Sequence, residues 1–219
     1  MNRQRKPRRM PPQPGPESLG QRRPKAVEPY TNAYQIRTYT DTYRRIVEDM
    51  LHAVPAAAVG DSIAADYIAR MIPCHLAAVR MADNLLRFTE DAGLRNLAAS
   101  TAARENTAMK ALRCLEQHCR QQKNTPEAVA AYRQQAERLR RTAAYTLQHL
   151  PASADSPDAL YRRQMAALYR GTVGLSALAV RQPIDARLRT AAEITLTEQR
   201  QTLFRLEQQP AAPRRRKGR

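Results

Sequence analysis

The chain contains one sequence pattern twice, and this internal repeat constrains the fold more than any other feature. Residues 61–71 (DSIAADYIARM) recur as residues 155–165 (DSPDALYRRQM), at a spacing of 94 positions. The same spacing still pairs Leu94 with Leu188 much further along the chain. Self-similarity over this length indicates that one structural unit occurs twice.

An earlier segment repeats at a spacing of 89, which pairs Tyr43 with Tyr132. The shorter spacing places an insertion in the second copy just before Asp155, and insertions between copies belong in loops. We therefore predict two helical repeats, residues 29–124 and 125–209.

The two ends of the chain have a different composition. Residues 1–28 contain eight Lys or Arg, two Glu and six Pro, and residues 210–219 contain five Lys or Arg and no acidic residue. Together the ends carry most of the formal net charge of +17. Basic, Pro-rich segments with few apolar side chains cannot bury enough surface to offset the entropy lost on ordering. We therefore predict that both ends are disordered tails.

The region between the tails has the composition of an all-helical protein. Ala, Leu, Arg, Gln and Glu are frequent, Gly is scarce, and no stretch alternates β-branched and polar residues. Asp61 or Ser62 is expected to cap the second helix. Thr125-Pro126-Glu127 and Ser156-Pro157-Asp158 each combine an N-cap residue with a first-turn proline, and Gly93 suits the left-handed position after a helix. We predict an all-α antiparallel helical bundle with six main helices, three per repeat, over approximately residues 32–54, 62–93, 94–122, 125–150, 156–182 and 184–209.

One ionisable residue interrupts the apolar stripe of each of two neighbouring predicted helices. His75 lies four positions after Met71 and four before Val79, on the apolar face of the second helix. Glu105 occupies a similar position in the third helix. A buried carboxylate needs a partner, so we predict a hydrogen bond between His75 and Glu105.

The segment around His75 resembles a known family signature. Residues 66–82 (DYIARMIPCHLAAVRMA) are similar to the MIPHH-type motif of the bacterial domain of unknown function 305. The resemblance is strong within the first repeat and extends to the second only through the internal repeat. It implies a ferritin-like bundle with suspected metal binding, to copper in some members. The metal-ligand positions that it implies in this chain are Met71, Cys74, His75, Met81 and Glu105.

Several positions depart from the family pattern. Cys74 stands in place of the first histidine, and Glu105 stands where glutamine is usual. Ala108 and Leu112 replace an acidic residue and a methionine, and in the second repeat Met165 alone survives from the motif. The motif is therefore degenerate.

One interpretation of the site is metal binding. Cys, His and Met are soft or borderline ligands suited to copper or zinc. Adjacent residues point about 100° apart on a regular helix, so Cys74 and His75 reach one ion only if the turn is distorted. Pro73 removes a backbone hydrogen bond, and we expect it to kink or loosen that turn.

The other interpretation is a structural polar pair. The repeat spacing places Tyr169 at the position of His75 and Gln199 at the position of Glu105. These two residues are able to form a neutral hydrogen bond in the same place. The second repeat thus keeps a polar pair at these positions but lacks the candidate metal ligands, and this pattern favours a structural role.

A second, weaker cluster occurs in the third helix. Cys114 and His118 lie one turn apart, and Cys119 follows directly. Two ligands on one helix are common by chance, so this spacing alone is weak evidence for zinc.

The tails provide an alternative function. Basic clusters without acidic residues attract nucleic acid or another polyanion, although they also increase solubility alone. The candidate polyanion-binding residues are Arg3, Arg5, Lys6, Arg8, Arg9, Arg214, Arg215, Arg216 and Lys217.

The sequence favours a non-enzyme. It contains no Gly-rich phosphate loop, no nucleophile elbow and no repeated Glu with Glu-x-x-His pattern of di-iron bundles. Its first ten residues are charged and polar, unlike a secretory signal, and no apolar stretch approaches the roughly 20 residues of a membrane span. The odd number of cysteines, three, suggests free thiols. We predict a cytoplasmic structural or interaction module without a resident cofactor, with copper or zinc binding as the alternative; an acidic partner or self-association is compatible with the sequence.

Overall fold

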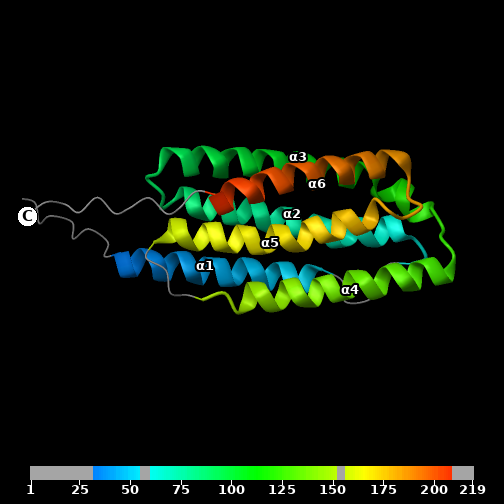
Figure 1. Ribbon diagram of the computed structural model, residues 1–219, viewed down its shortest axis with the longest axis horizontal. Helices are drawn as coiled ribbons and strands as arrows, with labels where there is room; N and C mark the ends of the chain where they lie inside the picture. Colours follow the sequence, from blue (N-terminus) through cyan, green and yellow to red (C-terminus); the bar gives the residue numbers. More distant parts are fainter. Residues whose placement is uncertain (1–31, 55–59, 152–155, 209–219) are drawn as a thin grey trace, which may run out of the picture. The chain divides into compact units, whose positions relative to one another are not determined.

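The computed structural model describes residues 32–54, 60–151 and 156–208, which form six α-helices and no strand. Figure 1 shows α1 (Asn32–Ala53), α2 (Ile63–Leu86), α3 (Ala92–Gln121), α4 (Pro126–Gln148), α5 (Pro157–Ala179) and α6 (Ala186–Gln208). The predicted all-α helical bundle is therefore confirmed. The predicted tails, residues 1–28 and 210–219, lie outside the described residues.

Among the described residues, no helix combines the length and the apolar character needed to cross a bilayer.

The predicted N-caps occur at the starts of three helices. Each cap side chain accepts a hydrogen bond from the backbone N–H three residues later, which satisfies a donor that the first helical turn leaves unpaired. These caps are Ser62 of α2, Thr125 of α4 and Ser156 of α5.

The prediction that Gly93 ends the second helix is wrong. α2 stops at Leu86, and α3 begins one residue before Gly93. Asp91 is the N-cap of α3, because its carboxylate accepts a hydrogen bond from the Leu94 N–H at 2.9 Å. A left-handed glycine occurs instead at Gly60, ahead of α2, with φ of 58°.

Pro73 lies inside α2, and the helix continues without interruption to Leu86. The loosened turn expected at this proline therefore does not divide the helix.

The helices are arranged in three layers of two (Figure 1). α2 and α5 pack against each other in the central layer. α1 and α4 cover one side of this layer, and α3 and α6 cover the other. All six helices belong to one compact unit. Polar side chains that α2 and α5 direct inward must therefore find partners within the protein.

Two arginines that the repeat spacing pairs make equivalent contacts. Arg95, near the start of α3, donates to the Leu86 carbonyl oxygen at 3.4 Å. Arg189, near the start of α6, donates to the Val180 carbonyl oxygen at 2.7 Å. Each arginine thus pairs with a carbonyl group that the end of the preceding helix leaves available.

Candidate functional site

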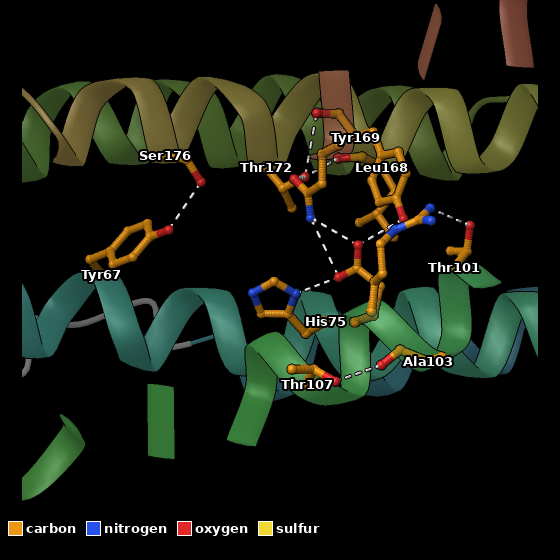
Figure 2. A network of polar contacts seen from close by, with 12 residues as sticks. Tyr67, His75, Thr101, Ala103, Thr107, Leu168, Tyr169, Thr172 and Ser176 are labelled. Carbon is orange, nitrogen blue, oxygen red and sulfur yellow. Dashed lines mark hydrogen bonds and ion pairs between the residues drawn. The ribbon is translucent and has the colours of Figure 1, made fainter. Parts of the chain in front are cut away.

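His75, Tyr169 and Thr172 belong to a network of polar side chains in the core of the bundle (Figure 2). The carboxylate of Glu105 lies at the centre of this network. Nδ1 of His75 hydrogen-bonds Oε2 of Glu105, which confirms the predicted pair. The Tyr169 hydroxyl donates to Oε1 at 2.7 Å, and the Gln199 amide lies 3.2 and 3.4 Å from the two carboxylate oxygens. The Thr172 hydroxyl donates to the Gln199 carbonyl oxygen at 2.6 Å. Four helices, α2, α3, α5 and α6, therefore meet at one carboxylate.

The network keeps Glu105 ionised in a buried position. Glu105 is only 5% exposed, and burial by itself raises the pKa of a carboxyl group. Hydrogen bonds and charge from His75, with further hydrogen bonds from Tyr169 and Gln199, outweigh burial and lower the Glu105 pKa below its ordinary value. Burial and the nearby negative charge of Glu105 raise the Tyr169 pKa well above its ordinary value, so the phenol remains a donor.

Tyr169 and Gln199 do not form the hydrogen bond predicted between them. Both donate to Glu105 instead, and Gln199 accepts from Thr172. The physical reason is the contact between α2 and α5, which brings both halves of the chain to the same carboxylate. An ionised carboxylate is a stronger acceptor than a neutral amide oxygen.

The two candidate methionine ligands lie in apolar surroundings. Met71 is 0% exposed and Met81 is 1% exposed, and they belong to two different clusters of the hydrophobic core. Their packing resembles that of ordinary core methionines, which fill irregular spaces between helices.

Cys74 is a buried thiol beside a small cavity of about 30 Å³, which Arg70 and Leu168 also line. Burial, followed by the negative charge of Glu105, raises the Cys74 pKa to about 12. The thiolate, which is the form that binds metals, is therefore disfavoured. Within the described residues, no group of three or more His, Cys, Asp or Glu side chains is placed to hold a metal ion.

Nε2 of His75 is buried and has no hydrogen-bond partner within the described part of the chain. Figure 2 shows this nitrogen on the side of the ring toward Tyr67, whose hydroxyl lies 3.0 Å from that of Ser176. Nδ1 donates to Glu105, so Nε2 presents a lone pair when the ring is neutral and an unpaired N–H when the ring is charged. Nε2 of His75 is therefore still available to bind a partner, whereas the carboxylate of Glu105 and the amide of Gln199 already have hydrogen-bond partners.

The second candidate cluster is dispersed. Cys114 is exposed, whereas Cys119 is buried. Nε2 of His118 lies 3.0 Å from a carboxylate oxygen of Asp185, so this histidine has a partner in the loop before α6. The three cysteines are free thiols.

The candidate polyanion-binding residues of both tails lie outside the described residues. Binding of nucleic acid or another polyanion by the tails stays a prediction.

A buried ion pair near the start of α2 was not predicted from the sequence. Asp66 is 0% exposed and Arg70 is 2% exposed, and Nε of Arg70 lies 2.7 Å from Oδ2 of Asp66. Arg133 and Glu137 of α4 each lie 3.9 Å from one member of the pair. The four-residue spacing of Asp66 and Arg70 was a signal for a helical ion pair. That spacing does not distinguish a buried pair from an exposed one.

A protein-family model described as "Domain of unknown function (DUF305)" matches residues 64–209. The chain belongs to the DUF305 family. The DUF305 match is one continuous stretch from the start of α2 to just beyond α6, so the resemblance is wider than the sequence motif indicated. No curated protein and no solved structure matches the chain.

Proposed function

We propose that this DUF305 protein is a non-catalytic structural or interaction module, in which the degenerate metal-binding motif has become part of the core. The observation that carries the proposal is the environment of Glu105, whose carboxylate accepts hydrogen bonds from His75, Tyr169 and Gln199. A metal ion at this carboxylate would have to displace protein donors that already satisfy it. The carboxylate and its partners belong to four helices, so the network stabilises the contacts between the two halves of the bundle.

The surroundings of the other motif residues support the same proposal. A metal ion bound through Cys74 must displace a proton from a thiol whose pKa is about 12. Met71 and Met81 are already packed in separate apolar clusters. Retention of Met71 and His75 is thus explained by packing and by the hydrogen bond to Glu105.

Elemental analysis of the full chain, purified without a metal-chelating tag, tests this proposal. We expect copper and zinc well below one ion per chain. One ion per chain that disappears in a Cys74→Ser, His75→Ala double variant would overturn the proposal. A Cys114→Ser, His118→Ala double variant is the matched control, because it removes an equivalent pair of soft ligands from the third helix.

The unpartnered Nε2 of His75 supports the alternative of a single soft ion bound near Cys74 and His75. Titration of the reduced protein with Cu(I) in competition with a chromophoric chelator distinguishes this alternative. A metal role requires saturable binding that the Cys74→Ser variant weakens at least about tenfold, the loss of one ligand bond. Equal, non-saturable uptake by both proteins is expected from the structural proposal.

A further inference from the structure

A cavity of about 340 Å³ lies between the middle of α1, the start of α5 and the end of α4. Its walls include the apolar side chains of Val47, Leu147 and Leu160. This volume lies within the range of approximately 300–1,000 Å³ that is typical of pockets for small organic ligands. The cavity is remote from the network around Glu105, and none of the residues of that network lines it.

One polar group at the cavity has no protein partner among the described residues. Gln164 is 3% exposed, and its carbonyl oxygen accepts from the Tyr39 hydroxyl at 2.7 Å. The amide nitrogen of Gln164 donates to no described residue. Oγ1 of Thr40 also makes no hydrogen bond, but this atom is closed off from the cavity as well as from solvent. Buried polar groups are normally paired, so the Gln164 amide is the donor available to a group bound in the cavity.

The equivalent place in the other half of the bundle contains a protein carboxylate. By the repeat spacings, Leu160 corresponds to Asp66 and Gln164 corresponds to Arg70. Asp66 is completely buried there and forms its ion pair with Arg70, close to Arg133. Where the first half holds the carboxylate of Asp66, the second half has an apolar leucine and an open cavity.

The cavity has no residue equivalent to Asp66, but it keeps charged residues at the positions equivalent to Arg133 and Glu137. Arg44, which lines the cavity, corresponds to Arg133, and Glu48 corresponds to Glu137. The guanidinium of Arg44 is 64% exposed and lies 3.7 Å from Asp41, so it is able to move toward a bound anion. The cavity therefore combines an apolar wall, one unpaired donor, one mobile cation and the carboxylate of Glu48.

We propose that this cavity binds a small carboxylic acid with an apolar body. Its carboxylate accepts a hydrogen bond from the Gln164 amide and attracts the guanidinium of Arg44. Its apolar body packs against Val47 and Leu160. The ligand thus supplies the acceptor that Asp66 supplies in the first half.

Hexanoate is a suitable probe, with 1-hexanol as the control of equal chain length. In methyl NMR spectra of the full chain, we expect hexanoate to shift the signals of Val47, Leu147 and Leu160 in a saturable manner. We expect 1-hexanol to bind about tenfold more weakly, because it lacks a charged acceptor. Equal affinity for the two probes, or no shifts at these three residues, would overturn the proposal.

Charge-changing variants at the rim of the cavity provide an independent measurement. Arg44→Gln is expected to weaken hexanoate binding about threefold, and Glu48→Gln is expected to strengthen it by a similar factor. Arg37→Gln, at a position that is 84% exposed and outside the cavity, should leave affinity unchanged. The same affinity in Arg44→Gln, Glu48→Gln and Arg37→Gln would exclude recognition of the carboxylate.

Discussion

The two halves of the bundle have similar helices and apolar contacts but different buried charges. At equivalent positions, the first half has His75 and Glu105, and the second has Tyr169 and Gln199. The first half also buries the ion pair of Asp66 with Arg70, whereas the second has a cavity beside Leu160. The same apolar packing accommodates charged residues in one half and neutral residues in the other. A buried polar group needs a hydrogen-bond partner, but the partner need not be the same residue type in both halves. The buried charges are concentrated in the first half. Neutral groups of the second half stabilise Glu105, whereas charged groups of α4 lie near the ion pair.

The largest effect should follow removal of the shared carboxylate. Glu105→Ala leaves His75, Tyr169 and Gln199 without their acceptor, and we expect a loss of about 3–5 kcal/mol in the free energy of unfolding. The equivalent change in the second half, Gln199→Ala, should cost only about 1–2 kcal/mol, because it removes one neutral donor. Urea unfolding followed by circular dichroism measures both. Equal losses for the two variants would show that the halves contribute equally to the network.

The buried ion pair of α2 can be converted to the residues of the second half. Asp66→Leu leaves the Arg70 charge uncompensated in a buried position, and we expect a loss of about 3 kcal/mol. The double variant Asp66→Leu, Arg70→Gln should unfold within approximately 1 kcal/mol of the natural protein, because both charges are removed together. Denaturant unfolding of the natural protein, of Asp66→Leu, of Arg70→Gln and of the double variant gives the coupling energy. A double variant as unstable as Asp66→Leu would contradict this account.

A smaller effect is expected where α4 approaches α5. A Cβ atom added at Gly171 would lie 2.8 Å from Cβ of Ala143, a rigid neighbour, whereas one added at Gly174 would meet the flexible end of Leu139 at 3.0 Å. The first half has Ala77 at the position of Gly171. We therefore expect Gly171→Ala to lower the melting temperature, with a net loss of about 1 kcal/mol after the gain in helix propensity.

Gly174→Ala is the matched control, and we expect it to be neutral or to stabilise by up to about 1 kcal/mol. Similar melting temperatures for Gly171→Ala and Gly174→Ala would show that the α4–α5 contact adapts as readily as the α1–α2 contact.

The smallest effect concerns pH. The folded-state pKa of Glu105 is lowered, so its ionisation stabilises the protein fully above the ordinary carboxyl pKa of roughly 4.3, and this contribution is lost as pH falls through the folded-state value. The difference in unfolding free energy between the natural protein and Glu105→Gln should be constant near neutral pH and should shrink in acid. Unfolding curves from pH 7 to about pH 3 measure this difference. A difference that grows in acid would mean that the Glu105 pKa is raised.

Sequence reasoning was most successful where the signal is local. The caps Thr125 and Ser156, and the pair of His75 with Glu105, follow from the spacing of residues on one helix or on two neighbouring helices. It was wrong about Gly93, because Asp91 provides a stronger start signal for the following helix than a glycine provides as an end signal. The metal-ligand prediction is a different case, since residue types can be read from the chain but their separation in space cannot.

The sequence alone determined six helices, their order and the apolar stripes that carry His75 and Glu105, because these depend on contacts between residues close in the chain. Only the tertiary structure decided that Tyr169 and Gln199 bind Glu105 rather than each other, and that Leu160 borders a cavity where Asp66 forms an ion pair. Both outcomes depend on how α2 packs with α5 and how α1 and α4 cover them. Such contacts join residues far apart in the chain, and the helical period carries no information about them.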